Sequence, residues 1–244
     1  MRAALLAAGR GVRIGADIPK TLVPIGPQRP LFDYLLDGLK RSGISDLLIV
    51  TGFRPDAIAQ AATAQWGEEG LTFVFNARYA SWGNFHSVRL ALDQSPGADV
   101  LVVNSDIVIS PEVYGRVLSS WGDLVLAVQR RDRLDEEDMR VELDGTRVAA
   151  ISKSLKLVRS HGEYAGVSLL RRDAARVYLQ LATDAEWRAT TGLYYEDIYA
   201  QMIGRVDVRA AEVGPGEYAE VDTPADYASA EQVIEGLFTS PDAS

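Results

Sequence analysis

The chain alternates short apolar segments with segments of helical periodicity, and this alternation constrains its fold more than any other feature. Apolar segments cover Arg2–Ala7, Leu47–Phe53, Leu71–Phe75 and the stretch DVLVVNSD, which ends at Asp106. Strands that are apolar on both faces are typical of parallel sheets buried between two layers of helices. The first half of the chain therefore predicts an α/β fold with a mostly parallel sheet.

Segments with helical periodicity separate and follow these strands. In the first half they cover Leu31–Arg41, Pro55–Trp66 and Asn84–Leu92, and a further helix begins at Pro111, a residue favoured in the first turn. The order of strands and helices predicts a three-layer α/β/α, Rossmann-like arrangement.

The pattern changes after the fifth predicted strand, Asp123–Val128. Asp144 and Gly145 stand between two alternating segments within Arg140–Lys153, which indicates a β-hairpin inserted into the fold. The remaining predicted elements are two helices, a strand and a last helix, covering Arg172–Leu181, Gly192–Ile203, Val206–Ala210 and Thr223–Leu237. We expect one domain over residues 1–244 with a frayed tail from residue 236, and either a monomer or a homodimer.

Composition limits the chemistry that is available. The 244 residues include no cysteine and only two histidines, so any metal ion must be held by oxygen ligands, which suits Mg²⁺ or Mn²⁺. The formal net charge of -9 argues against binding to nucleic acid. No apolar run approaches the roughly 20 residues that a membrane-spanning helix needs. We therefore expect a cytoplasmic protein with small-molecule substrates and no membrane contact.

A glycine-rich turn follows the first predicted strand, in the stretch LLAAGRGVR. Gly9 and Gly11 leave the backbone amides accessible to a phosphate group, and Arg10 and Arg13 add positive charge. Lys20 follows a proline that stiffens the chain before it, although taken alone it is equally compatible with a solvated loop lysine. The stretch matches neither the P-loop pattern nor GxGxxG, and glycine content alone is also compatible with a structural turn.

Together, however, LAAGRGVRIGADIPKTL resembles the signature of nucleotidyltransferases that activate sugar phosphates and alcohol phosphates. The resemblance implies a nucleotidyltransferase fold in which the turn wraps the phosphates of a nucleoside triphosphate and Lys20 contacts them. It also implies that a lysine of the hairpin region reaches phosphate. Lys153 is the first candidate and Lys156 competes with it, although each is also compatible with a solvated strand position. The residues expected to act in catalysis are Lys20, Arg10, Arg13 and Lys153. The residues expected to bind the nucleotide are Leu6, Ala7, Ala8, Gly9, Arg10, Gly11, Asn76, Ser81, Asn84, Ser87 and Ser105.

Two aspartates match the metal-binding positions of the same family. Asp106 follows the fourth predicted strand, and Asp222 lies in the late motif EVDTP. The resemblance implies that both hold Mg²⁺ beside the triphosphate. Local sequence is also compatible with plain capping roles, because Asp222 directly precedes a helix start.

Later segments resemble small phosphocholine cytidylyltransferases and their phosphonate-using relatives. The segments are FNARYASWGNFHSVRLAL, EYAGVSLL, LYYEDIY and EVDTPADY. They combine aromatic rings with carboxylates, a set that suits an ammonium group through cation–π attraction and charge, although any single ring is as compatible with core packing. The residues expected to bind the acceptor are Trp82, Tyr164, Tyr194, Tyr195, Glu196 and Asp197, with Asp197 also a possible metal ligand.

The resemblance implies attack by an acceptor phosphate or phosphonate oxygen on the α-phosphorus of CTP, with pyrophosphate as the leaving group. Phosphocholine, phosphoethanolamine, aminoethylphosphonate and hydroxyethylphosphonate are the expected acceptors. A sugar-1-phosphate nucleotidyltransferase using UTP, GTP or dTTP is the alternative. A non-catalytic nucleotide sensor is less favoured because Lys20, Asp106 and Asp222 are all present. A dinucleotide-binding protein is disfavoured because the third glycine is misplaced and the second strand lacks a terminal acidic residue.

Overall fold

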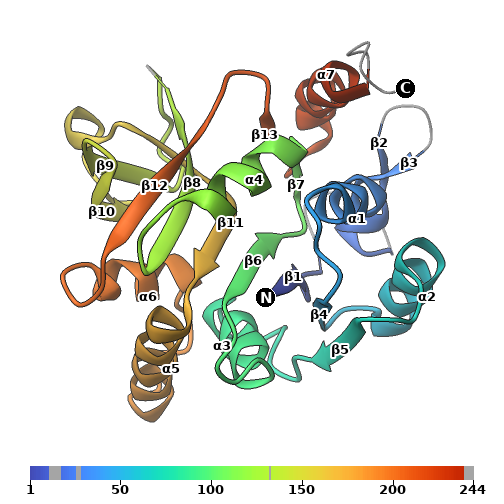
Figure 1. Ribbon diagram of the computed structural model, residues 1–244, viewed down its shortest axis with the longest axis horizontal. Coiled ribbons are helices and arrows are strands. Elements are labelled where there is room, and N and C mark those ends of the chain that lie inside the picture. Colours follow the sequence, from blue (N-terminus) through green and yellow to red (C-terminus); the bar gives the residue numbers. More distant parts are fainter. Residues whose placement is uncertain (11–17, 26–28, 132, 239–244) are drawn as a thin grey trace.

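The structure, a computed structural model, describes residues 1–10, 18–25, 29–131 and 133–238. Its centre is a nine-stranded sheet in the order β5-β4-β1-β6-β11-β8-β12-β10-β9 (Figure 1). The strands are β1 (Arg2–Ala7), β4 (Leu47–Thr51), β5 (Leu71–Phe75), β6 (Val100–Asn104), β8 (Leu124–Arg130), β9 (Arg140–Asp144), β10 (Arg147–Ser152), β11 (Gly162–Leu170) and β12 (Val208–Val213). Their pairings make all of them run in one direction except β10 and β11, so the sheet is mixed and mostly parallel, as predicted.

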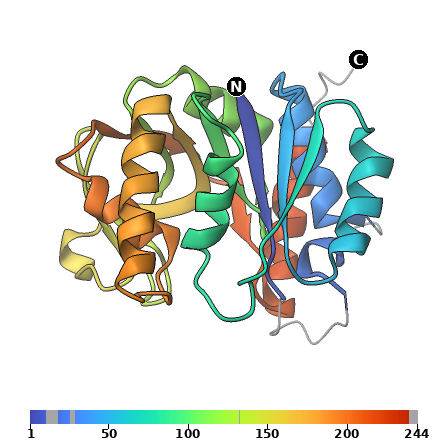
Figure 2. The same ribbon diagram turned by 90° about the horizontal axis from the view of Figure 1, so that it is seen from below.

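Helices cover both faces of this sheet (Figures 1 and 2). On one side lie α1 (Leu31–Arg41), α2 (Pro55–Trp66), α4 (Pro111–Ser119) and α7 (Tyr227–Phe238). On the other side lie α3 (Phe85–Asp93), α5 (Arg172–Trp187) and α6 (Tyr195–Met202). No helix within these described ranges is both long and apolar enough to cross a membrane.

Successive side chains of the central strands point to opposite faces of the sheet, so the apolar interior consists of two cores. Leu47 and Ile49 of β4 pack into the core beneath α1, whereas Leu48 and Val50 of the same strand pack into the core beneath α3. Both sets are fully buried, because successive side chains of a strand point to opposite faces of the sheet. The apolar runs of the sequence are therefore the two-sided strands that the pattern predicted.

Strand β11 is the main feature that the sequence interpretation did not include. It lies between β6 and β8 and runs antiparallel to both. Its register shifts between Tyr164 and Ser168, and its first residues also pair with β9 of the hairpin. Gly166 sits within the shift with φ +74°, a left-handed conformation that favours glycine. The irregular strand thus pairs both with the central strands β6 and β8 and with β9 of the hairpin at the edge of the same sheet.

Two short pairs of strands complete the fold. One pair is β2 (Pro24–Ile25) with β3 (Arg29–Pro30), and the other is β7 (Ile107–Ile109) with β13 (Tyr218–Glu220). The pair β7–β13 is antiparallel and joins segments far apart in the sequence, with Glu220 opposite Ile107. It is the element that brings the late part of the chain to the end of β6.

The predicted boundaries needed small corrections. The strand predicted to reach Phe53 ends at Thr51, and α6 begins at Tyr195 because Tyr194 and Asp197 form a capping box there. The last helix begins at Tyr227 rather than Thr223, after a 3-10 turn over Pro224–Asp226. It continues to Phe238, and residues 239–244 lie outside the described part of the chain.

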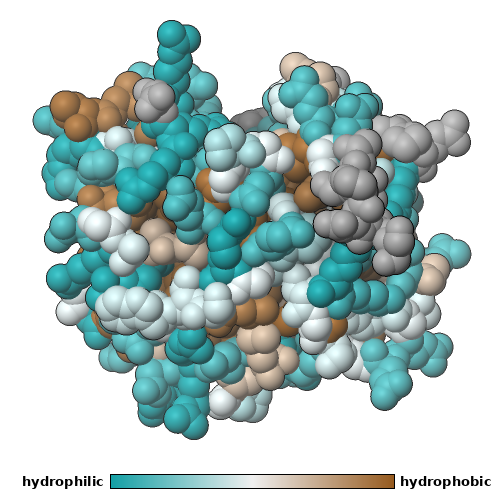
Figure 3. Space-filling model, turned by 45° about the horizontal axis from the view of Figure 1, so that its top comes forward, coloured by the Kyte–Doolittle hydropathy of each residue, from teal (hydrophilic) through white to brown (hydrophobic). Residues whose placement is uncertain are grey.

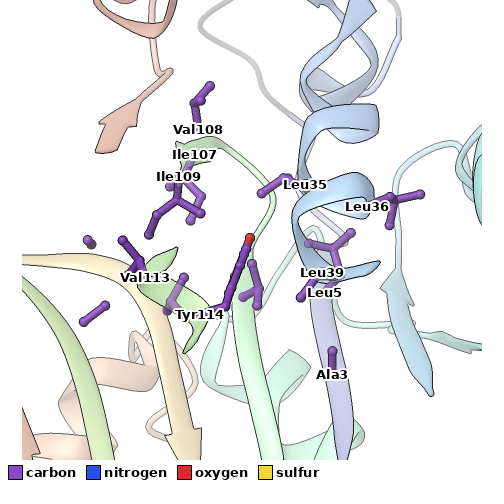
Figure 4. Close-up of a cluster of buried hydrophobic side chains, with 14 of the residues drawn as sticks. Ala3, Leu5, Leu35, Leu36, Leu39, Ile107, Val108, Ile109, Val113 and Tyr114 are labelled. Carbon is purple, nitrogen blue, oxygen red and sulfur yellow. The ribbon is translucent and has the colours of Figure 1, made fainter. Parts of the chain in front are cut away.

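The core beneath α1 contains a tyrosine with no polar partner. Tyr114 is fully buried and packs beside Leu35, Leu39 and Ile109 (Figure 4). Its hydroxyl has no hydrogen-bond partner among the described residues, and burial raises its pKa well above the usual range. A buried hydroxyl that loses its hydrogen bonds to water lowers the free energy of unfolding.

We predict that Tyr114→Phe raises the free energy of unfolding by about 1 kcal/mol, because it removes the unpaired hydroxyl and keeps the ring. Tyr178→Phe is the matched control. The Tyr178 hydroxyl is equally buried but donates a 2.9 Å hydrogen bond to the Phe85 carbonyl, so its removal should lower stability. Urea unfolding of both variants checks the signs, and a clear loss of stability in Tyr114→Phe would contradict the prediction.

Candidate active site

Ala7, Ala8 and Gly9 of the glycine-rich stretch form one wall of a cavity at the carboxyl ends of β1 and β6. The Ser105 hydroxyl donates a 2.8 Å hydrogen bond to the Leu6 carbonyl, which ties the ends of the two strands together. The cavity has a volume of about 340 Å³. Its lining is Leu6, Ala7, Ala8, Gly9, Pro19, Lys20, Thr21, Asn84, Ser87, Asn104, Ser105, Asp106 and Asp222. Ligands of open α/β sheets bind at this edge.

Three carboxylates meet at one end of this cavity. Asp106, Glu220 and Asp222 each offer an oxygen that lies within 4.8 Å of the others. The β7–β13 pairing brings them together, since the Val221 amide donates a 2.8 Å hydrogen bond to the Asp106 carbonyl. Asp226 holds the following turn by accepting hydrogen bonds from the Asp222 and Thr223 amides.

The Lys20 ammonium group lies among these carboxylates. It forms an ion pair with Asp222 and lies 3.4 Å from an Asp106 oxygen. Burial acts to lower the pKa of Lys20, but the attraction of Asp106 and Asp222 outweighs it, so the pKa is raised above its usual value. The lysine therefore carries its charge at every physiological pH and is available to an anionic ligand.

The same cluster fits a divalent cation. Its donors are all carboxylate oxygens, the ligand type that Mg²⁺ and Mn²⁺ prefer, and one Asp106 oxygen is buried without a hydrogen-bond partner among the described residues. Glu220 is exposed at the surface, yet desolvation within the cluster, together with repulsion from Asp106 and Asp222, raises its pKa to about 8. Three acidic groups this close favour a cationic partner.

A second cavity of about 210 Å³ adjoins the first and shares Asn84, Asn104, Asp106 and Asp222 with it. The rest of its lining comes from the hairpin, β11, α6 and β13. These residues are Glu137, Met139, Lys153, Glu163, Tyr164, Gly166, Tyr194, Glu196, Tyr218 and Glu220. Four glutamates and three tyrosines make this cavity acidic and aromatic, so the two cavities meet at the carboxylate cluster and differ in chemistry.

Two of these glutamates are buried. Burial raises the pKa of Glu163 and of Glu196 to about 7 in each case, with smaller effects from neighbouring charges. Arg131 lowers the pKa of Glu163, and its guanidinium lies 2.8 Å from a Glu163 oxygen. Asp197 raises and Lys153 lowers the pKa of Glu196. Both carboxylates are therefore partly protonated near neutral pH.

Direct contacts hold together two loops that border the cavities, the loop before α3 and the loop before α6. The Gly83 amide donates a hydrogen bond of 2.6 Å to the Thr191 carbonyl, and a Cβ at Gly83 would lie 1.8 Å from the Leu193 carbonyl oxygen. No other residue fits there. One residue later, the Asn84 side chain accepts a 2.9 Å hydrogen bond from the Tyr195 amide at the start of α6. The loop before α3 and the loop before α6 are thus held as one unit.

Most of the residues predicted to bind nucleotide, metal or acceptor line the two cavities. Leu6, Ala7, Ala8, Gly9, Lys20, Asn84, Ser87, Ser105, Asp106 and Asp222 surround the first. Lys153, Tyr164, Tyr194 and Glu196 line the second, where the Lys153 ammonium lies 5.5 Å from the centre of the Tyr194 ring. Gly11 and Arg13 lie outside the described residues.

Other predicted residues lie near the cavities without lining them. The Asn76 side-chain amide donates to the Ser87 hydroxyl, the Ser81 hydroxyl donates to the Arg78 carbonyl, and the Trp82 ring stacks on Phe85. These contacts suit structural roles.

Arg10, Asp197 and Tyr195 likewise make contacts within the protein. The Arg10 guanidinium lies over the Phe53 ring, and the Asp197 carboxylate accepts a hydrogen bond from the Tyr194 amide as a helix cap. Tyr195 is fully buried and donates its hydroxyl hydrogen bond to Asn104. Tyr195 therefore supports the site from behind.

Sequence reasoning missed Asn104, Glu163, Tyr218 and Glu220. One signal was available for Glu220, since it lies two positions before Asp222 in an extended segment and alternate residues of a strand share a face. Asn104 similarly lies two positions before Asp106 at the end of β6. Glu163 had no such signal, because it depends on β11 turning from the sheet toward the hairpin.

Comparison with known proteins agrees with this geometry. The MobA-like NTP transferase domain family matches residues 3–193. The choline-phosphate cytidylyltransferase of Streptococcus pneumoniae is 26% identical over 238 residues, covering 96% of this chain and 98% of that protein. The CMP-5'-(3-aminopropyl)phosphonate synthase of Streptomyces rubellomurinus is 28% identical over 95% of this chain, which spans 38% of that longer protein.

A solved structure shares the fold. The inositol-1-phosphate CTP transferase from T. maritima superposes with a TM-score of 0.81 at 20% sequence identity, covering 97% of both chains. Fold and site together define a nucleotidyltransferase. The chain belongs to the MobA-like NTP transferase domain family.

The raised pKa of Glu196 predicts a pH-dependent stability difference. A carboxyl group whose pKa is about 7 when folded and near 4.5 when unfolded contributes stability below pH 4.5, and this contribution is lost as the pH rises through 7. We therefore expect Glu196→Gln to match the wild type near pH 4.5 and to exceed it by about 2–3 kcal/mol at pH 8. Urea unfolding of both proteins across this range provides the test, and a constant difference would contradict the raised pKa.

Proposed function

We propose that this nucleotidyltransferase is a CTP-dependent cytidylyltransferase that transfers CMP to a small phosphomonoester or phosphonate. The observation that carries the proposal is the meeting of two cavities at Lys20 and the carboxylate cluster. One cavity is backed by the glycine-rich turn and suits a triphosphate. The other is lined by glutamates and tyrosines and suits a small acceptor.

In the proposed reaction, an oxygen of the acceptor phosphate or phosphonate attacks the α-phosphorus of CTP. A new P–O bond forms, and the bond from the α-phosphorus to the bridging oxygen of pyrophosphate breaks. The acceptor is already anionic at neutral pH, so its attack needs no general base. The task of the protein is then to position two anions and to stabilise negative charge, as in phosphoryl transfer generally.

Each part of the site has a place in this reaction. Ala7, Ala8 and Gly9 line the cavity in which the nucleotide would lie, and a Cβ at Gly9 would meet no atom within 4 Å. The Lys20 ammonium would neutralise phosphate charge. Asp106 and Asp222, with Glu220, would hold Mg²⁺, which supplies further positive charge between the two anions when it is bound.

The names of the two curated relatives support CTP as the nucleotide and a small phosphate or phosphonate as the acceptor. The acceptor cavity of about 210 Å³ also suits a small molecule. A sugar 1-phosphate with UTP, GTP or dTTP is the competing possibility. Cytoplasmic location, the single domain and the oligomeric state stay predictions.

We predict that CTP gives the fastest pyrophosphate release among the common nucleoside triphosphates, in the presence of Mg²⁺ and a non-sugar acceptor. The measurement is a coupled pyrophosphate assay in which each nucleotide is combined with phosphoethanolamine, phosphocholine, aminoethylphosphonate, hydroxyethylphosphonate and several hexose 1-phosphates. A chelator should abolish the activity. A preference for UTP, GTP or dTTP with a hexose 1-phosphate would replace the proposed function by the competing one.

We predict that Asp222→Asn lowers kcat by about 10²–10³, because it removes a charge that pairs with Lys20 and would hold the cation. It should also raise the Mg²⁺ concentration needed for half-maximal rate. Asp173→Asn is the matched control, since Asp173 is an exposed residue of α5 that pairs with Arg176. Equal activity of the two variants would remove Asp222 from the proposed mechanism.

A further inference from the structure

The acceptor cavity contains two buried glutamates whose carboxylates are incompletely paired. Glu163 and Glu196 are only 4% and 6% exposed, and both line the same cavity of about 210 Å³. One Glu196 oxygen has no hydrogen-bond partner in the described part of the chain. One Glu163 oxygen forms an ion pair with the Arg131 guanidinium at 2.8 Å, but this contact lies outside hydrogen-bond geometry. A buried carboxylate oxygen without a donor is costly, so this cavity favours a ligand that brings N–H groups.

We propose, building on the proposed function, that the acceptor carries an N–H-bearing ammonium group that donates hydrogen bonds to Glu196 and Glu163, and that the site selects against a trimethylammonium group. A primary ammonium has three N–H donors, enough for the unpaired Glu196 oxygen and for a hydrogen bond to Glu163. A trimethylammonium has none. The acceptor class is therefore an aminoalkyl phosphate or aminoalkyl phosphonate.

The aromatic rings of the cavity also favour an N–H-bearing ammonium group over a trimethylammonium group. A quaternary ammonium group is recognised through the faces of several aromatic rings. Here the Lys153 ammonium already lies 5.5 Å from the centre of the Tyr194 ring, and the Arg131 guanidinium lies 5.9 Å from the centre of the Tyr218 ring. Each of these rings thus has one face taken by a cation of the protein.

The third ring, Tyr164, is held by its neighbours. It packs edge-to-face against Tyr195 and Tyr199, with ring centres 6.1 Å and 6.5 Å away, and its hydroxyl lies 3.2 Å from that of Tyr195. Met139 is the single aliphatic side chain in the lining. The described cavity therefore lacks the apolar cage that methyl groups would need, and offers oxygen acceptors in its place.

The charges that line the cavity also favour an acceptor with an ammonium group. Lys153 is the one cationic residue of the described lining, against Glu137, Glu163, Glu196 and Glu220. Lys153 lies 3.6 Å from Glu137, and Arg131 pairs with Glu163, so negative charge remains in excess. Burial raises the pKa of Glu163 and of Glu196 to about 7, which favours their neutral forms. An ammonium group beside them would act in the opposite direction and favour their charged forms. The phosphate of the acceptor would then lie toward Lys20 and the shared carboxylate cluster, with its amino group at the opposite end.

The test is a methylation series of one acceptor with CTP and Mg²⁺: phosphoethanolamine, its N-methyl and N,N-dimethyl derivatives, phosphocholine, and ethyl phosphate without nitrogen. Aminoethylphosphonate and hydroxyethylphosphonate extend the series to phosphonates. We expect kcat/KM for phosphoethanolamine or aminoethylphosphonate to exceed that for phosphocholine by about tenfold or more, with the loss greatest at the last methylation. Equal or faster turnover of phosphocholine would overturn the inference and leave the proposed cytidylyl transfer intact.

Variants of the two buried glutamates test whether these side chains select the amine-bearing acceptor. In Glu196→Gln and Glu163→Gln the ratio of kcat/KM for phosphoethanolamine to that for ethyl phosphate should fall toward one, mainly through a higher KM for the amine. Glu212→Gln, an exposed residue of β12, should keep the wild-type ratio. Unchanged ratios in both cavity variants would overturn the assignment of these carboxylates.

Calorimetry separates failure of this inference from failure of the proposed function. Phosphoethanolamine, phosphocholine and ethyl phosphate are titrated into the protein with Mg²⁺ and a non-hydrolysable CTP analogue. Tighter binding of the primary amine without any turnover would support the cation selectivity and overturn the proposed reaction. Binding that does not distinguish the three acceptors would overturn the selectivity, whatever the turnover.

Discussion

The pairing of β7 with β13 is the contact on which the candidate active site depends. It places Glu220 opposite Ile107 and brings the Val221 amide to the Asp106 carbonyl. Asp106 and Asp222 thereby meet although most of the second half of the chain separates them. Three carboxylates at such short range repel one another, which helps to raise the pKa of Glu220 and makes a neighbouring cation favourable. Lys20, from the loop after the glycine-rich turn, supplies that charge within the protein.

The same electrostatic principle extends into the acceptor cavity. Glu163 and Glu196 are buried side chains with a raised pKa, and in both cases burial is the largest cause. A fold selected for stability alone would replace such groups by neutral ones. Acidic side chains kept in a buried, partly unpaired state are typical of sites in which a ligand completes the charge balance. The stability lost at these positions is the physical basis of the ligand preferences proposed above.

Much of this architecture could be predicted from the sequence because it depends on local patterns. Two-sided apolar strands such as Leu47–Thr51 and the hairpin around Asp144 and Gly145 are both specified by neighbouring residues. Strand β11 could not be predicted in the same way. Its course depends on a register shift at Gly166 and on pairing with β6, β8 and β9, which are all distant in sequence.

The candidate site shows the same division. Asp106 and Asp222 could be proposed because each stands in a short motif, and the structure places their carboxylates within 4.8 Å of one another. Glu163 could not be found, because its place in the cavity follows from the irregular course of β11. Trp82 and Asp197 stood in motif segments, but their side chains make packing and capping contacts. A motif identifies the segment that approaches a ligand, whereas the tertiary contacts decide which of its side chains face that ligand.

Tyr195 shows how such tertiary contacts make two cavities act as one site. Its backbone amide donates to Asn84 and its hydroxyl donates to Asn104, and both asparagines lie where the cavities meet. Since the oxygen of each side-chain amide is occupied by Tyr195, each amide nitrogen remains as the donor for other partners. A Cβ at Gly166 would lie 3.0 Å from the Asn104 nitrogen, so the glycine in β11 preserves the space that this donor needs. A buried tyrosine thereby fixes two hydrogen-bond donors at the boundary where the proposed reaction would bring two anions together.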